Sequence, residues 1–177
     1  MPITQVSARQ IEQFICLASN YVLTDNSTAQ KAFNATANGA LTVQAGTTYL
    51  IEAVYNITST GVTSHTWGAL LAGTATLTSG MLTYMSDGAS GNNLRTLTSI
   101  YSTNPLTVTV LTAASTSATE NVTIVIKGII RVNAAGTIIP QVKLSAATGG
   151  TPTILANSYF KATPIGTNTI TNVGNWS

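Results

Sequence analysis

The sequence predicts an all-β protein, an antiparallel jelly-roll β-sandwich with a short N-terminal arm or helix. Close to a fifth of its 177 residues are Thr, which is β-branched and favours extended backbone. Stretches of alternating apolar and polar residues recur from residue 39 onward, and turn signals rich in Gly, Asn, Asp or Pro separate them. No helical pattern lies between these stretches, so a parallel α/β sheet is not expected.

The alternating stretches give the expected strands, and the segments between them give the turns. Turns are expected at Asp87-Gly88 and Asn104-Pro105. Pro140 lies within one expected strand, and we place it at a strand end or edge because it has no N–H to donate. The expected strands are residues 40–43, 48–57, 65–72, 74–78, 81–86, 94–101, 106–112, 121–132, 137–145, 152–155 and 158–163.

Two segments near the N-terminus show helical signals instead. In residues 7–18 the apolar residues fall at helical spacing after a possible capping box, although the same stretch could form an extended arm. A second capping box in residues 27–30 predicts a helix of one to two turns ending near Phe33. We therefore expect a docking arm at 1–19 and a jelly-roll domain at 20–177. The apolar side chains expected to dock the arm on a partner are Ile11, Phe14, Ile15 and Leu17.

The surface is expected to be poor in charge. Asp, Glu, Lys and Arg make up 7% of the chain, against about 25% in ordinary globular proteins. Neighbouring copies would repel one another little, which favours permanent assembly. The net charge of +2 is dispersed, so nucleic-acid binding is not expected. No apolar run approaches the roughly 20 residues that cross a bilayer, and no signal peptide is evident, so we expect assembly in a reducing cytoplasm and no membrane partner.

Residues that could carry catalysis are few and scattered. The only imidazole is His65, and no serine lies in a Gly-x-Ser-x-Gly elbow, so His65 is expected to be a hydrogen-bonding residue of a strand or loop. Glu52 lies within the long strand 48–57, where it could pair with Lys127 or Arg131. We expect no enzymatic activity, catalytic residue, cofactor or metal. The acids, none close to another in sequence, are Glu12, Asp25, Glu52, Asp87 and Glu120.

Several motifs carry a family resemblance. The short strand, glycine turn and long strand of residues 38–52 are similar to the start of the jelly roll in the tumour necrosis factor and complement globular-head superfamily. Combined with later segments, residues 20–177 resemble a family of small structural proteins of tailed phages. That resemblance implies a jelly roll, threefold symmetry and a place on the virion surface. The later segments are residues 64–67, 71–76, 126–133, 136–141, 164–166 and 174–177.

The expected function follows from this resemblance. We expect a homotrimeric capsid decoration (cement) protein on the capsid surface, assembled in the host cytoplasm. It would bind the head lattice through the major capsid protein or another virion protein, with many weak contacts adding up by effective concentration. The alternative is a fibre or tail-tip protein that binds a host-surface receptor. A depolymerase is disfavoured because paired acids are absent from the sequence pattern.

Overall fold

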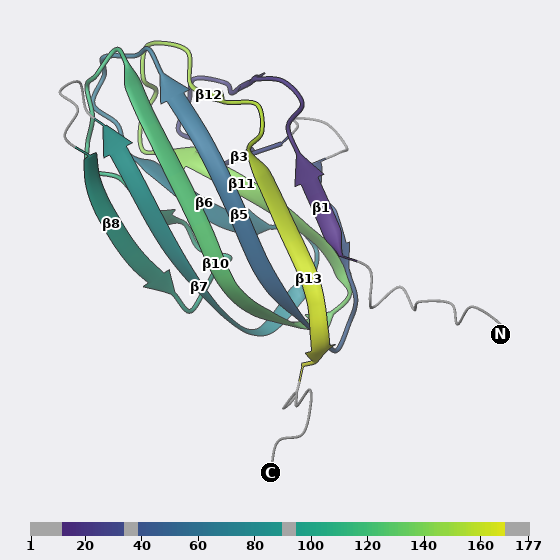
Figure 1. Ribbon diagram of the computed structural model, residues 1–177. Helices are drawn as coiled ribbons and strands as arrows, with labels where there is room; N and C mark the ends of the chain where they lie inside the picture. The colour runs from purple at the N-terminus through teal and green to yellow at the C-terminus, as the bar shows by residue number, and fades with distance from the viewer. Residues whose placement is uncertain (1–11, 34–38, 90–94, 169–177) are drawn as a thin grey trace.

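The computed structural model describes residues 12–33, 39–89 and 95–168, which form two antiparallel sheets packed face to face (Figure 1). These residues contain thirteen strands and no α-helix. Accordingly, none of them belongs to a helix long and apolar enough to cross a membrane. The prediction of an all-β sandwich is confirmed.

The larger sheet has eight strands, and its long members span the whole height of the molecule (Figure 1). Two short strands, β2 (Tyr21–Val22) and β12 (Thr153–Ile154), pair with each other beside the upper end of β5. The main path runs in the order β1 (Gln13–Cys16), β13 (Tyr159–Thr167), β5 (Thr47–Ser59), β10 (Glu120–Ala134), β7 (Thr76–Ala89) and β8 (Arg95–Ser102).

The smaller sheet has five strands and covers the inner face of the larger one. Its main path is β3 (Gln30–Lys31), β11 (Gly136–Leu144), β6 (Trp67–Ala72) and β9 (Thr109–Val110), and β4 (Leu41–Val43) also pairs with β11. Eight of the strands form the jelly-roll framework, and they are taken here as strands one to eight in chain order: β1, β3, β5, β6, β9, β10, β11 and β13. In the larger sheet the neighbours are β1, β13, β5 and β10, which are strands one, eight, three and six. In the smaller sheet they are β3, β11, β6 and β9, which are strands two, seven, four and five. This alternation of consecutive strands between two sheets is a jelly roll. The β7–β8 hairpin is inserted between the fourth and fifth strands and widens the larger sheet.

The core lies between the sheets and follows from strict alternation in the two central strands. Along β5 every second side chain from Tyr49 to Ile57 is buried, and β10 repeats this pattern from Val122. The two strands pair antiparallel from Glu120–Ser59 to Arg131–Thr48. Each large apolar side chain buried in this way contributes about 1.5–3 kcal/mol relative to an exposed one. The largest fully buried side chains include Trp67, Tyr49, Tyr55, Tyr84 and Phe160.

Both helix predictions fail where the structure describes the chain. Residues 13–16 form β1, an edge strand paired with β13, so the described part of the segment 7–18 is a strand rather than a helix. The second capping box forms no helix either. Gln30 uses its side-chain amide to bind both the backbone N–H and the carbonyl of Thr24, at 2.8 and 2.7 Å, and so closes a loop that leads into β3. Residues that can cap a helix can also satisfy loop backbone in this way, and here the adjacent strand β11 decides the outcome.

Three local predictions also need correction. The turn expected at Asp87-Gly88 lies inside β7, which joins the two strands expected at 74–78 and 81–86 into one. The strand expected at 106–112 is only Thr109–Val110, and its valine side faces outward, with Val110 half exposed. Pro140 lies in the interior of β11, not at an edge or an end.

The position of Pro140 has a clear physical reason. Its partner in β6 is Leu71, whose N–H is donated away from β11 to the carbonyl of Pro105. On its other side the Pro140 carbonyl accepts a hydrogen bond from Ala32 N–H at 2.9 Å. In an antiparallel sheet the N and O of one residue point to the same side, so the proline nitrogen faces the break between β3 and β4. The pairings of β3 and β4 with β11 involve residues 141–142 and 136–138, so neither pairing includes Pro140.

We expect Gly128→Ala to lower the free energy of unfolding by about 2–4 kcal/mol. A Cβ at Gly128, whose φ is 154°, would lie 2.1 Å from the carbonyl oxygen of Met81 in β7. The paired strands β10 and β7 would therefore have to separate. Gly46→Ala is the control. Gly46 also has a positive φ, but no atom lies within 4 Å of the added Cβ, so the loss should be about 1 kcal/mol. Urea titrations of both variants measure the difference, and equal losses would contradict the steric argument.

Candidate functional site

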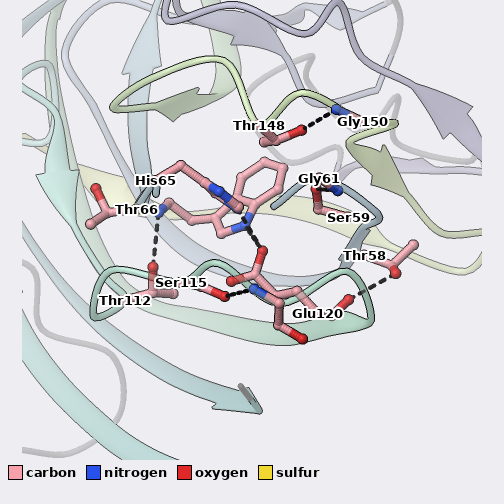
Figure 2. Close-up of polar contacts among 12 residues, drawn as sticks. Thr58, Ser59, Gly61, His65, Thr66, Thr112, Ser115, Glu120, Thr148 and Gly150 are labelled. Carbon is pink, nitrogen blue, oxygen red and sulfur yellow. Dashed lines mark hydrogen bonds and ion pairs between the residues drawn. The ribbon is translucent and has the colours of Figure 1, made fainter. Parts of the chain in front are cut away.

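The densest group of buried polar side chains lies at one end of the sandwich, beneath the loops (Figure 2). It consists of His65, Trp67 and Glu120, whose exposed fractions are 1%, 0% and 3%. His65 lies before β6 and pairs through its backbone with Ser115, Trp67 opens β6, and Glu120 opens β10. We call these three residues the Glu120 cluster.

Glu120 is the acceptor at the centre of this cluster. Its Oε2 accepts a hydrogen bond from Trp67 Nε1 at 2.9 Å and lies 2.8 Å from His65 Nε2. The other imidazole nitrogen, Nδ1, lies 2.7 Å from the carbonyl oxygen of Thr63. A carbonyl can only accept, so Nδ1 is the donor of this hydrogen bond. Every nitrogen of the imidazole and the indole therefore has a partner.

The backbone around the cluster is tied by further hydrogen bonds. Thr58 Oγ1 donates to the Glu120 carbonyl at 2.8 Å, and Trp67 N donates to Thr112 Oγ1 at 2.8 Å. At the same end of the molecule, Asp25 accepts hydrogen bonds from the backbone N–H groups of Thr148 and Gly149. Partial burial raises the pKa of Asp25, but these hydrogen bonds outweigh it and hold the pKa below its usual value. Loops from four parts of the chain are thus fixed together.

The geometry of the Glu120 cluster is that of a structural anchor. The cluster is closed to solvent, and both ring nitrogens of His65 are engaged. The hydroxyl of the nearby Ser115 accepts a hydrogen bond from Ser117 N rather than facing the imidazole. The expectation that His65 is a hydrogen-bonding residue of a strand or loop agrees with this arrangement.

Sequence reasoning missed the link between His65 and Glu120, which are 55 residues apart. The alternation of inward and outward side chains along the strands does contain a signal for this contact. Glu120 is two residues before Val122 and shares the inward phase of β10, while His65 and Trp67 are also two residues apart. An acid in the buried phase requires a buried donor, and the indole and imidazole supply it.

The remaining acids lie elsewhere. Glu52, expected to pair with Lys127 or Arg131, instead forms an ion pair with Lys161 at 3.1 Å, and Glu12 joins the same lysine at 3.3 Å. Hydrogen bonds to Glu52 and Glu12 raise the pKa of Lys161. Nowhere in the described ranges do three or more His, Cys, Asp or Glu side chains gather as a metal site would require.

The four residues expected to dock the N-terminal arm have different surroundings. Ile11 lies outside the described residues. Phe14 is 58% exposed and stacks on Tyr159, with ring centroids 5.7 Å apart. Ile15 packs against the core, and Leu17 is buried in it. Of the described three, only Phe14 therefore offers its side chain to a partner, and the docking role stays a prediction.

A row of exposed apolar side chains crosses the outer face of the larger sheet. Leu50 in β5 pairs with Ile129 in β10, which pairs with Met81 in β7. All three are exposed, although each is large and apolar. A hollow of about 410 Å³ lies beside Met81 and Ile129 and is also lined by Arg131. We call Leu50, Ile129 and Met81 the apolar row.

Comparisons with known proteins identify no family for this chain. No family model matches it, and no curated protein sequence matches it. Among solved structures, a chain in the structure of infectious bursal disease virus Gt strain is similar over 87% of this chain and 40% of its own length, with 13% sequence identity and a TM-score of 0.25. A likeness of this quality assigns no site residues.

We expect Glu120→Ala to lower the free energy of unfolding by about 3–5 kcal/mol, because it leaves the buried His65 and Trp67 donors without their acceptor. Glu52→Ala is the matched control. Glu52 forms a partly exposed ion pair, so its loss should cost about 1 kcal/mol or less. Chemical denaturation of both variants checks the contrast, and a Glu120→Ala protein as stable as Glu52→Ala would refute the anchoring role.

Proposed function

We propose that the protein is a non-enzymatic structural component of a tailed-phage virion, a homotrimer that decorates the capsid by binding the head lattice. The jelly-roll sandwich and the resemblance of several sequence segments to small phage structural proteins support this proposal. The closed Glu120 cluster supports a role without catalysis, since its groups are buried and bind one another. The observation that carries the proposal is the apolar row.

The apolar row suits contact with another copy of the chain. Contiguous apolar side chains on a folded surface mark interaction sites, and this row lies on a flat sheet face rather than in a loop. The next outward row carries Lys161, Glu52 and Lys127, and the ion pair between Glu52 and Lys161 compensates one of its two positive charges. In a closed ring every subunit uses the same patches, and three copies would cover the row of each.

We expect Ile129→Glu to abolish the trimer and leave a folded monomer, because a carboxylate would be buried in the centre of the subunit contact. Leu106→Glu is the matched control. Leu106 has a similar exposed fraction, 42% against 39% for Ile129, but lies in the loop before β9. Mass photometry of the wild type and both variants measures the assembly state. A monomeric wild type, or an Ile129→Glu protein that stays trimeric, would overturn the proposed interface.

Attachment to the capsid is tested separately, at the N-terminal strand. Phe14→Ala should reduce co-sedimentation with heads that lack the protein and leave the thermal melt nearly unchanged, since Phe14 is exposed. Leu17→Ala should lower the free energy of unfolding by about 2–5 kcal/mol, because Leu17 belongs to the core. Undiminished attachment of Phe14→Ala would show that the arm does not dock through this residue. Cryo-electron microscopy of the source particle would locate the protein directly.

A further inference from the structure

A hollow of about 340 Å³ opens on the outer face of the smaller sheet, on the opposite side of the sandwich from the apolar row. Its floor is a cross-strand row in which Lys143 of β11 pairs with Gly68 of β6, and Gly68 pairs with Val110 of β9. Val108 packs over Gly68, where an added Cβ would lie 2.8 Å from the Val108 Cγ2, so the hollow has Lys143 on one side and Val108 and Val110 on the other. Its volume is at the lower end of small-ligand sites, which span about 300–1,000 Å³.

Lys143 provides the hollow with a positive charge that no described carboxylate neutralises. Glu12 and Glu52 are paired with Lys161, and Glu120 faces His65. Asp25 binds the backbone of residues 148–149, and Asp87 lies on β7 of the larger sheet. Lys31 lies opposite Gln141 on the neighbouring strand and so on the same face as Lys143, because Gln141 and Lys143 share one phase of β11. An external anion can therefore pair with Lys143.

The other walls offer hydroxyl groups on one side and an apolar surface on the other. Ser145 Oγ accepts a hydrogen bond from Thr66 N at 2.9 Å, which leaves the Ser145 O–H proton available as a donor. Thr66 lines the same wall. Val108 and Val110 form the opposite wall, and Val110 is half exposed. One cation, two hydroxyls and a small apolar wall thus converge on a single hollow.

We propose that this hollow binds an acidic sugar residue, such as the uronic acid unit of a surface polysaccharide. The carboxylate pairs with Lys143, ring hydroxyls exchange hydrogen bonds with Ser145 and Thr66, and the C–H face of the ring packs on Val108 and Val110. A simple inorganic anion would accept hydrogen bonds from the lysine and the hydroxyls but leave the valine wall without contacts. The site does not depend on the trimer interface or on where the protein lies in the virion.

The test is isothermal titration and saturation-transfer NMR on the full-length protein with glucuronic acid, and with glucose as the neutral counterpart. We expect glucuronate to bind at least tenfold more tightly than glucose, and Lys143→Gln to reduce glucuronate affinity at least tenfold. Lys127→Gln, the same change at an exposed position on the outer face of the larger sheet, should leave affinity unchanged. Val110→Asp, which places a carboxylate across the hollow from Lys143, should abolish binding without unfolding because Val110 is half exposed.

Three results would overturn this assignment. Equal binding of glucuronate and glucose would remove the role of the charge, and full binding by Lys143→Gln would place the site elsewhere. Displacement of glucuronate by an equal concentration of sulfate would show an anion site without sugar recognition. Because the variants lie far from the apolar row, a monomeric protein that binds glucuronate would contradict the proposed trimer and support the sugar site.

Discussion

The pairing of β5 with β10 is the constraint on which the rest of the molecule depends. These two strands lie side by side in the middle of the larger sheet, and their inward side chains form one wall of the core. The alternation of side chains along these two strands decides which residues face the core and which face outward. It turns Tyr49 and Ile124 inward, sets Leu50 and Ile129 outward in the apolar row, and at the Glu120–Ser59 end brings a carboxylate under the loops. A shift of one residue in this register would reverse every one of these assignments.

The long strands could be predicted because their alternation extends over many residues. Residues 48–57 and 121–132 both carry an inward apolar phase, and both are central strands. The short strands could not, because their evidence is tertiary. Gln30 has the spacing of a capping box, yet its amide binds Thr24, and two residues of pairing with β11 are enough to fix β3. Local signals of one or two turns are easily overridden by such contacts.

The candidate sites, like the short strands, depend on contacts between segments that are distant in the sequence. Scattered acids in the sequence indicated that no catalytic group would form, but scattering along the chain does not prevent convergence in space. His65 and Glu120 meet because the loops before β6 and β10 meet at one end of the sandwich. The Lys143 hollow likewise depends on three strands, and only the pairing of β11, β6 and β9 sets Gly68 between the lysine and the valine. Neither pattern is visible in a window of the sequence. The two outer faces therefore differ in chemistry: one carries the apolar row, and the other carries Lys143 beside Ser145 and Thr66.

Pro140 has a consequence for the fidelity of folding. The smaller sheet contains very short strands, and β3 and β4 pair with the same side of β11 on either side of the proline. If either strand slid along β11 to cover residue 140, one of its carbonyls would face a nitrogen without a proton, and a ladder hydrogen bond worth about 1 kcal/mol would be lost. Two residues of correct pairing provide little energy to reject such errors. The proline thus works as a stop between neighbouring segments, discouraging each from invading the position of the other while the sheet assembles.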